Sequence, residues 1–165
     1  MTRVFLGLGS NKGDRLNFLR RAVEELSAVN GLNLRRVSGV YETEPFGVKE
    51  QDDFLNAAVE LETTLAPEQC GEILRKIERS VGQKAVARWG PREIDIDVLF
   101  FGDTKLKSAS LTLPHPGVPN RRFVLVPLAE IAPEFRDPES GFTVSELLAR
   151  CTDAGLVKTT SMTIR

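Results

Sequence analysis

Residues 54–62 show the cleanest alternation of apolar and other side chains in the chain. Every second residue from Leu55 to Leu61 is aliphatic, which predicts a β-strand with one face in the core. Phe54 and Asn56 fall on the opposite face. A phenyl ring beside an amide is suited to stack on a heterocycle and pair with its edge, although an isolated exposed Phe is also common.

Residues 94–101 predict a second strand, and it carries two carboxylates. The even-numbered residues from Ile94 to Phe100 are apolar, whereas Asp95 and Asp97 share the other face with their Cα atoms roughly 7 Å apart. Because the far end of this strand is apolar on both faces, we expect it to be central in its sheet. Two ionised carboxylates at this separation repel by about 2 kcal/mol at an effective dielectric of about 20, so a neighbouring cation would relieve them.

Mg²⁺ fits this pair of aspartates, because it prefers oxygen ligands and is usually held by one or two carboxylates together with substrate phosphates. The segment before the strand reads R-W-G-P-R from Arg88 to Arg92, and its two guanidinium groups suit the phosphates. The alternative is a solvated sheet face on which the arginines simply pair with Asp95 and Asp97.

The rest of the pattern predicts amphipathic helices and short strands, separated by two long polar loops. The loops are residues 42–53 and 83–92, and we interpret the first as a candidate lid because of its length. Residues 103–113 are expected to hold a turn and a short strand, residues 123–133 are core-like, and the C-terminal end is a polar, weakly specified tail. The remaining predicted elements are strands at 3–8 and 32–41 and helices at 14–28, 67–82 and 144–151.

The first predicted strand ends in the segment G-L-G-S-N-K-G-D, residues 7–14. Its glycines and lysine are reminiscent of a phosphate-binding loop, but the spacing matches neither of the usual phosphate-loop motifs. We therefore expect a turn that leads into a helix, with Asp14 favouring the helix N-terminus through the dipole.

The order of elements, β-α-β, loop, β-α, loop, β, predicts an α+β fold. A ferredoxin-like βαββαβ sandwich satisfies it, with an antiparallel sheet, two helices on one face and C-terminal additions. In that arrangement the face with Phe54 and Asn56 and the face with Asp95 and Asp97 form one open surface away from the helices. No internal repeat or linker divides the sequence, so residues 1–165 are expected to form a single domain.

The composition mainly excludes several classes of protein. The chain has 41% hydrophobic and 27% charged residues and a net charge of −1, so no global field attracts nucleic acid or anionic lipid. No apolar run reaches membrane length and no signal peptide is evident, so we expect a cytoplasmic protein. Cys70 and Cys151 are too few for a disulfide framework. The one histidine, His115, stands between two prolines and is expected to be a held, exposed imidazole.

The stretch R-W-G-P-R-E-I-D-I-D at residues 88–97 resembles the motif of the 6-hydroxymethyl-7,8-dihydropterin pyrophosphokinases, the folate-pathway enzymes. Further matches cover nearly the whole chain. They are G-L-G-S-N at 7–11, V-Y-E-T-E-P-F-G at 40–47, F-L-N-A-A-V at 54–59, L-P-H-P at 113–116 and R-R-F-V-L-V-P-L at 121–128.

This resemblance implies a ferredoxin-like monomer that uses ATP and two Mg²⁺ ions. It implies that the hydroxymethyl oxygen of the pterin attacks the β-phosphorus of ATP and that AMP leaves. By the family pattern, Asp95 and Asp97 bind both magnesium ions, and Arg92 and Lys84 are the further candidates for catalysis. No general base is assigned, because a metal-lowered hydroxyl pKa suffices.

The two substrates are implied to occupy separate sets of residues. Phe54 and Phe123 match the two rings that sandwich the pterin, and Asn56 matches the amide that pairs with its pyrimidine edge. The pterin-binding residues implied by the resemblance are Thr43, Pro45, Phe46, Phe54, Asn56, Trp89 and Phe123. The ATP-binding residues implied by it are Arg75, Glu78, Arg88, Arg92, Val98, Leu111, Thr112, His115 and Arg121.

The sequence departs from the family pattern in the loop after Gly82, where Gln83-Lys84-Ala85 stands in place of the arginines of many members. Lys84 offers a point charge without the bidentate geometry of arginine. Phe54 also stands where many members have Tyr, and Pro116 where a bulkier residue is usual.

Two other functions remain open at this point. A Mg²⁺-dependent nucleotide hydrolase would use the same pair of aspartates and would release phosphate or pyrophosphate without any pterin. A ferredoxin-like module that binds RNA or a small regulator is the other, since a fold does not determine a function. The net charge and the lack of an RNA-binding sequence motif argue against RNA.

Overall fold

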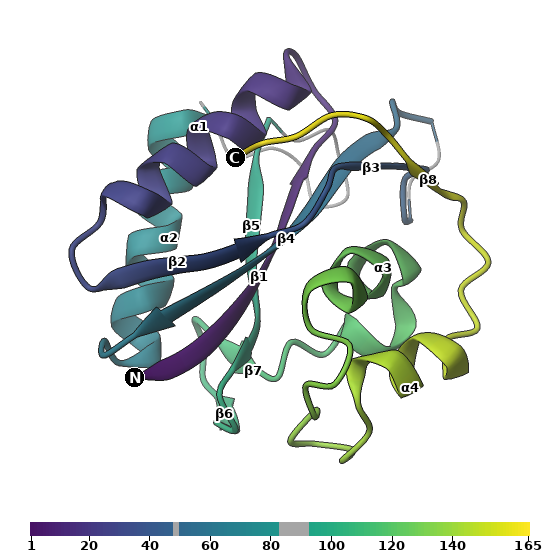
Figure 1. The fold of residues 1–165 in the computed structure, drawn as a ribbon. Coiled ribbons are helices and arrows are strands. Elements are labelled where there is room, and N and C mark those ends of the chain that lie inside the picture. The colour runs from purple at the N-terminus through teal and green to yellow at the C-terminus, as the bar shows by residue number, and fades with distance from the viewer. Residues whose placement is uncertain (48–49, 83–92) are drawn as a thin grey trace.

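In the computed structural model, which describes residues 1–47, 50–82 and 93–165, the chain folds around a six-stranded antiparallel sheet (Figure 1). Its strands are β1 (Thr2–Ser10), β2 (Leu32–Val37), β3 (Tyr41–Thr43), β4 (Phe54–Thr63), β5 (Asp95–Phe101) and β8 (Val157–Thr159). A separate two-stranded sheet consists of β6 (Leu106–Lys107) and β7 (Thr112–Leu113). The helices are α1 (Arg15–Ala28), α2 (Pro67–Val81), α3 (Arg122–Ile131) and α4 (Val144–Arg150), with a 3-10 turn at Val118–Asn120.

The strands lie in the order β5-β1-β4-β3-β8, and β2 pairs with β4 beside β3. β1 and β4 are long and central, and every pairing in the sheet is antiparallel. The predicted antiparallel α+β arrangement is therefore confirmed.

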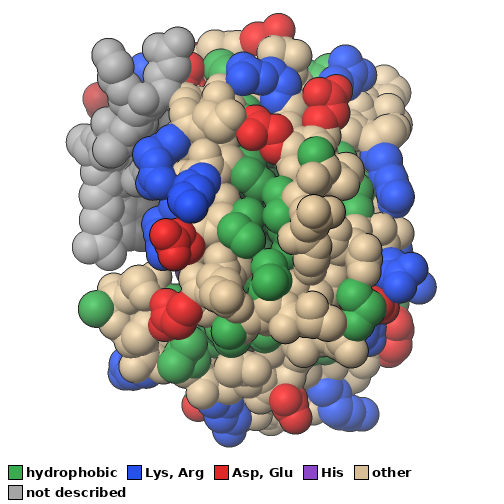
Figure 2. All heavy atoms as spheres, turned by 90° about the vertical axis from the view of Figure 1, so that its left-hand side faces the viewer, with side chains coloured by type: hydrophobic (Ala, Val, Ile, Leu, Met, Phe, Trp, Pro, Cys, Tyr) green, Lys and Arg blue, Asp and Glu red, His purple; other side chains and the backbone are tan. Residues whose placement is uncertain are grey.

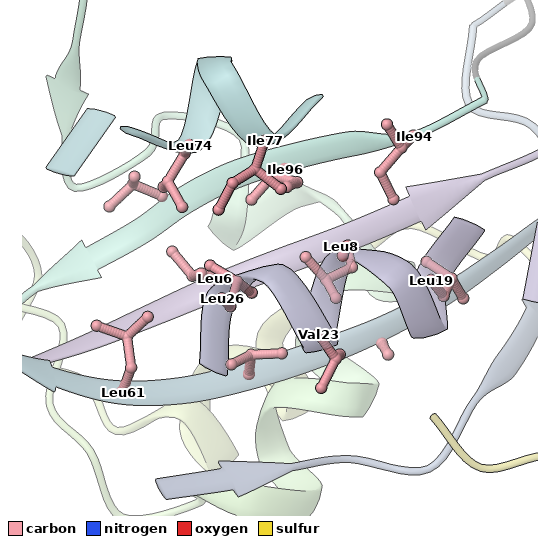
Figure 3. Close-up of a cluster of buried hydrophobic side chains, with 14 of the residues drawn as sticks. Leu6, Leu8, Leu19, Val23, Leu26, Leu61, Leu74, Ile77, Ile94 and Ile96 are labelled. Atoms are coloured by element: carbon pink, nitrogen blue, oxygen red, sulfur yellow. The ribbon is translucent and has the colours of Figure 1, made fainter. Parts of the chain in front are cut away.

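Helices α1 and α2 cover one face of the sheet, as the sequence predicts (Figure 1). Burying each large aliphatic side chain stabilises the fold by about 1.5–3 kcal/mol, so this layer is the rigid support of the molecule. Figure 3 shows its interior, in which the labelled side chains from α1, α2, the strands β1, β4 and β5 and the residue before β5 meet: Leu6, Leu8, Leu19, Val23, Leu26, Leu61, Leu74, Ile77, Ile94 and Ile96.

The starts of these two helices follow from local sequence. The Asp14 carboxylate accepts a hydrogen bond of 3.2 Å from the Asn17 N–H and so caps α1. Pro67 is the first residue of α2, where its missing N–H costs nothing, and the helix ends just before Gly82. The predicted helix cap at Asp14 is thus confirmed, whereas the turn predicted within residues 7–14 is shorter than expected, because β1 continues to Ser10.

The outer surface of this helical layer carries charges of both signs. Figure 2 shows Lys and Arg side chains interspersed with Asp and Glu side chains around a strip of hydrophobic ones. Such a mixed surface creates no single-sign field. Within the described part of the chain, no helix is both long enough and apolar enough to cross a membrane.

Helices α3 and α4 lie on the other side of the sheet (Figure 1). They bury a second cluster with Phe5 and Phe100 from the sheet and Leu125 and Leu128 from α3. The C-terminal additions therefore cover part of the face that the sequence predicts to be open. At the other end of the same face, a cavity is left uncovered.

Strand β5 corrects two predictions. It is the end strand of the sheet rather than a central one, because β1 is the strand paired with it. Its far end is apolar on both faces because the α1–α2 layer packs on one side and the α3–α4 cluster on the other. A β-bulge also shifts the register with β1, so that Phe5 faces Phe100 and Leu6 faces Val98. Phe100 therefore joins Leu99 in the second cluster instead of continuing the face of Val98.

Two further predictions need correction. The single strand expected at residues 32–41 is divided into β2 and β3, which both pair with β4 on either side of residues 38–40. The C-terminal tail is not weakly specified, because β8 pairs with β3 and Ile164 is buried in the first core cluster.

Candidate functional site

The uncovered end of the sheet is the floor of a cavity of about 440 Å³, called cavity A below. Its walls come from β1, β4 and β5, from the segment after β3, and from the start of α3. The residues that line it are Gly7, Leu8, Gly9, Thr43, Glu44, Phe46, Gln51, Phe54, Asn56, Ala57, Asp95, Asp97, Leu99, His115, Pro116, Arg121, Phe123 and Val124.

Two glycines of β1 keep this floor clear. Gly9 is registered with Asn56 on one side and Asp95 on the other, and Gly7 is registered with Asp97. A Cβ atom at Gly9 would lie 2.8 Å from the Asn56 Oδ1 atom, which real Cβ contacts do not tolerate. The absence of a side chain on β1 therefore allows the amide and the carboxylates of the two neighbouring strands to face the same space.

The Asn56 amide is held in one orientation. It is buried, and its Nδ2 donates a hydrogen bond of 2.6 Å to the Thr43 Oγ1 atom of β3. A buried amide that is fixed by a neighbour presents its remaining donor and acceptor positions to a ligand without loss of rotamer freedom.

Aromatic rings form the opposite side of cavity A. The Phe46 and Phe123 rings lie 5.9 Å apart between centroids, tilted by 55°. The Arg121 guanidinium carbon lies 5.3 Å from the centre of the Phe46 ring, within the range of a cation–π contact. Phe54 stands beside Gly9, with its Cδ2 atom 3.5 Å from where a Cβ would be. The cavity thus offers flat apolar surfaces together with the positive charge of Arg121.

A second cavity, cavity B, of about 430 Å³ lies on the other side of Asp95 and Asp97. It runs between α2, β5 and the segment from Ser108 to Thr112. Asp95, Asp97, His115 and Pro116 line both cavities. The two aspartates therefore stand on a wall that any pair of ligands in A and B would share.

The backbone between the two aspartates is held by α2. The Glu78 carboxylate accepts a hydrogen bond of 2.8 Å from the Ile96 N–H. Because β5 is an end strand, this contact satisfies a donor that the sheet does not reach, and it fixes the segment from Asp95 to Asp97 against α2. Glu78 also lines cavity B. It is one of the ATP-binding residues that the family resemblance implies.

His115 is half-buried rather than exposed, so the expectation from its flanking prolines is wrong. Burial lowers the pKa of His115, the Arg121 guanidinium lowers it further, and the Asp95 carboxylate opposes both effects. Its Nδ1 accepts a hydrogen bond of 3.0 Å from the Gly117 N–H, so in the neutral ring Nε2 carries the proton. His115 is therefore a neutral N–H donor at neutral pH.

The segment after β3 is tied to the turn before α1. The Asn11 Nδ2 group donates to the Gln51 side chain at 2.8 Å and to the Asp52 carbonyl at 2.9 Å. Arg15 forms an ion pair of 2.9 Å with Glu42 and a hydrogen bond of 2.9 Å to the Asp53 carbonyl. The asparagine of the G-L-G-S-N motif thus anchors one end of the loop that the sequence identifies as a candidate lid.

The structure brings most of the predicted site residues to these two cavities. Of the predicted pterin set, Thr43, Phe46, Phe54, Asn56 and Phe123 line cavity A, while Pro45 lines a small adjoining space. Of the predicted ATP set, Arg121 lines cavity A, and the following line cavity B: Arg75, Glu78, Val98, Leu111, Thr112 and His115. The predicted residues Lys84, Arg88, Trp89 and Arg92 lie outside the described residues.

Sequence reasoning missed several residues that line cavity A. Gly9 was assigned to a turn, whereas β1 continues through it to Ser10. The signal that could have found it is a pair of glycines two apart in a strand, which indicates a close approach of another group. The other missed lining residues are Gly7, Leu8, Glu44, Gln51, Ala57, Leu99, Pro116 and Val124.

Comparison with known proteins decides the family. A sequence model of the 7,8-dihydro-6-hydroxymethylpterin-pyrophosphokinase (HPPK) family matches residues 5–133. The chain belongs to the HPPK family. The match includes β1 from Phe5 onward with its two glycines, the strands β4 and β5, the helices α1 and α2, and α3 with its cavity residues.

Named relatives agree with this family. The chain is 47% identical over 156 residues to the 2-amino-4-hydroxy-6-hydroxymethyldihydropteridine pyrophosphokinase of Methylorubrum extorquens, covering 94% of this chain and 98% of that one. It is 43% identical over 143 residues to the enzyme of the same name from Synechocystis sp., covering 87% and 73%. It is 43% identical over 128 residues to that from Bacillus subtilis, covering 78% and 77%.

Solved structures show the same HPPK fold at low sequence identity. A crystal structure of Plasmodium falciparum HPPK-DHPS matches with a TM-score of 0.71 and 17% identity, covering 90% of this chain. The chain spans 43% of that longer protein. This likeness concerns the fold.

Proposed function

We propose that this protein transfers the pyrophosphoryl group of ATP to the hydroxymethyl oxygen of 6-hydroxymethyl-7,8-dihydropterin and releases AMP, a step of folate biosynthesis. The observation that carries the proposal is the shared wall. Asp95 and Asp97 line both a cavity with aromatic rings and a fixed amide and a cavity between α2, β5 and the segment before β7. Two substrates in these cavities would meet at the two carboxylates.

Cavity A is the proposed pterin site. A pterin is a flat heterocycle with a hydrogen-bonding edge, and cavity A offers Phe54, Phe46 and Phe123 for stacking and the Asn56 amide for that edge. The glycine floor at Gly7 and Gly9 leaves room for the ring to approach the aspartates. Trp89, which lies outside the described residues, is proposed to complete this site.

Cavity B is the proposed ATP site. Arg75 and His115 line it and supply hydrogen-bond donors suited to phosphate or ribose oxygens. Leu111 and Val98 supply apolar surface for the adenine, and Thr112 a hydroxyl. Lys84, Arg88 and Arg92, outside the described residues, and Arg121 at cavity A are proposed to contact the phosphates.

Asp95 and Asp97 fit the magnesium that accompanies ATP. They offer carboxylate oxygens on one face of β5 at the junction of the two cavities, and Mg²⁺ is commonly held by one or two carboxylates and substrate phosphates. Within residues 1–47, 50–82 and 93–165, no group of three His, Cys, Asp or Glu side chains is placed to hold a metal ion. We propose two ions, with these two carboxylates and ligand oxygens as their ligands.

In the proposed reaction the hydroxymethyl oxygen forms a bond to the β-phosphorus, the bond from that phosphorus to the oxygen of AMP breaks, and the hydroxyl proton is released. When bound, magnesium neutralises phosphate charge and lowers the pKa of the attacking hydroxyl. The chain's own residues mainly position the reactants: Asn56 and the rings orient the pterin, and His115 donates its N–H as a neutral group. Arg121 adds positive charge near the same wall.

We further propose that residues 1–165 act as one ferredoxin-like domain and as a monomer in the cytoplasm. The strand order β5-β1-β4 followed by β2 and β3 supports this topology, with β2 and β3 together taking the place of the second strand. Packing of the C-terminal strand and of Ile164 onto the same sheet and core supports a single domain.

The function is tested by chromatography of nucleotides after the protein is incubated with ATP and Mg²⁺, with and without the pterin. We expect AMP to form only when 6-hydroxymethyl-7,8-dihydropterin is present, together with a pterin diphosphate. Release of phosphate or pyrophosphate in the absence of the pterin would instead indicate a nucleotide hydrolase. If no nucleotide is consumed, calorimetry with a non-hydrolysable ATP analogue and Mg²⁺, followed by the pterin, would show whether either ligand binds.

Replacing Gly9 with alanine is expected to weaken pterin binding by about 1 kcal/mol or more, the scale of a lost hydrogen bond. The new methyl group must displace the Asn56 Oδ1 atom, 2.8 Å away, while Thr43 holds the other end of the same amide. The measurement is the Kd of the pterin by calorimetry in the presence of the ATP analogue. Gly7→Ala is the matched comparison, because its Cβ would lie 3.4 Å from Leu99 and should have a smaller effect. Equal affinities for both variants would contradict the role of Gly9.

A further inference from the structure

We propose that Asp153 is a positioning residue for the pterin side of cavity A, because it fastens the start of α3 to the end of β3 through the C-terminal tail. This inference rests on the proposed function. Asp153 lies beyond residues 5–133, the part of the chain that the family model matches, and it lines neither cavity A nor cavity B.

The first contact is at the start of α3. Arg121, the N-cap residue of this helix, makes no side-chain hydrogen bond to its first turn. Instead the Asp153 Oδ2 atom accepts a hydrogen bond of 3.0 Å from the Arg122 N–H. A helix start leaves its first N–H groups without intrahelical partners and favours a negative charge, so Asp153 replaces the missing cap from a distant part of the chain. The residues on either side of Arg122 are Arg121 and Phe123, which both line cavity A.

The second contact leads from Asp153 to β3. The Asp153 Oδ1 atom accepts a hydrogen bond of 2.9 Å from the Gly155 N–H, which shapes the turn that follows. Leu156 then donates to the Glu44 carboxylate at 3.1 Å and accepts from the Glu44 N–H at 3.4 Å. β8 continues by pairing Val157 with Thr43. In Figure 1 the tail accordingly runs from α4 past the edge of β3 and on toward α1.

The tail therefore joins two walls of cavity A that are distant in sequence. Thr43 orients the Asn56 amide, and Phe46 faces the Phe123 ring. A small space of about 10 Å³ lies between these walls and the tail, and it is lined by Thr43, Phe46, Phe123, Asp153 and Val157, so the tail packs close to both walls. Loss of the Asp153 carboxylate should widen the gap between Phe46 and Phe123 while leaving cavity B, on the far side of β5, unaffected.

The C-terminal end of α3 is held independently of Asp153. A change at Asp153 can therefore shift the start of the helix without unfolding it. Glu130 accepts hydrogen bonds from the Gly39 N–H at 3.1 Å and from the Tyr41 hydroxyl at 2.6 Å. Burial and this carboxylate together raise the pKa of Tyr41 to about 12, so the contact persists at neutral pH. With that end held, α3 should remain folded on the sheet when Asp153 is changed.

The test compares Asp153→Ala, Asp153→Asn and Asp103→Ala, the last removing an exposed carboxylate from the turn after β5. Steady-state AMP release gives KM for each substrate. For Asp153→Ala we expect the pterin KM to rise about 3- to 10-fold, within the range for losing a helix N-cap, and the ATP KM to rise clearly less, because Asp153 reaches the proposed phosphate contacts through Arg121 alone of the described ATP-binding residues. Asp153→Asn keeps an oxygen acceptor and should recover most of the parent's pterin KM. Asp103→Ala should match the parent.

Equal effects of Asp153→Ala on both substrates, or no effect, would overturn the positioning role. Hydrogen exchange of the unliganded protein provides a second readout that does not require activity. In Asp153→Ala, the peptides around residues 41–46 and 121–126 should both exchange faster, and faster exchange in only one of them would refute the coupling. If the parent shows no pterin-dependent AMP release while both peptides still respond, the proposed function fails and the fastening by Asp153 stands.

Discussion

Changing Asp97 to alanine is expected to lower the rate of AMP release at least about 100-fold, by comparison with the loss of one preorganised electrostatic contact in an active site. Asp97 is half-exposed on the wall shared by cavities A and B, opposite the side-chain-free Gly7. Removing its carboxylate leaves Asp95 as the one carboxylate of the pair, so the two proposed magnesium ions would lose one of their two protein carboxylates and would depend more on the ligand oxygens.

The measurement is single-turnover AMP release at saturating ATP, Mg²⁺ and pterin, so that a loss of binding is separated from a loss of rate. Asp97→Asn, which keeps the shape of the side chain and removes its charge, should lose nearly as much activity. Asp103→Asn, in the turn after the far end of β5, is the control for charge removal. If Asp97→Ala retained more than about a tenth of the parent rate, Asp97 would not have the role assigned to it.

The second large effect is expected at Phe54. Replacing it with alanine should weaken pterin binding by about 1–3 kcal/mol, the range measured for stacking of a base on an aromatic side chain. The Phe54 side chain is half-buried at the edge of cavity A beside Gly9, so its loss removes ligand contact more than core packing.

Phe54→Tyr keeps the ring and is the matched control, with an affinity close to that of the parent. Calorimetry with the pterin in the presence of the ATP analogue and Mg²⁺ measures the difference. An unchanged Kd in Phe54→Ala would remove Phe54 from the site and leave the Phe46–Phe123 pair as the aromatic surface.

The sequence predicted those parts of the fold that depend on local periodicity. The alternation from Leu55 to Leu61 correctly separated the core face of β4 from the face of Asn56. The helical repeats gave α1 and α2 to within a residue or two at each end. These predictions succeeded because the pattern of burial along a single strand or helix follows the order of its own apolar and polar side chains.

Features that depend on neighbouring segments could not be read in this way. Burial of β5 on both faces indicated a central strand, but the covering groups are helices and the strand lies at the end of the sheet. The bulge that turns Phe100 depends on the register with β1. The polar residues of β8 gave no strand signal, because what specifies that strand is the free edge of β3.

The candidate site was predicted in the same uneven way. Strand alternation indicated Phe54, Asn56, Asp95 and Asp97, and motif resemblance added Phe46 and Phe123. All of these residues line cavity A. Neither signal gave Gly9, whose importance lies in what its missing side chain leaves open, or Asp153, which acts through a backbone amide of another element. Roles of this kind become visible only when the strands are placed side by side.

The position of β8 also bears on how the molecule behaves in concentrated solution. A strand edge with unpaired backbone groups is a template on which a second molecule can add, and β3 carries such an edge that β8 occupies within the same chain. At the opposite edge of the sheet, the Ile96 N–H of β5 donates a hydrogen bond to the Glu78 carboxylate. A chain that ended before Val157 would uncover the edge of β3 and would also lose the buried Ile164, so we expect it to self-associate through that edge and to be less stable.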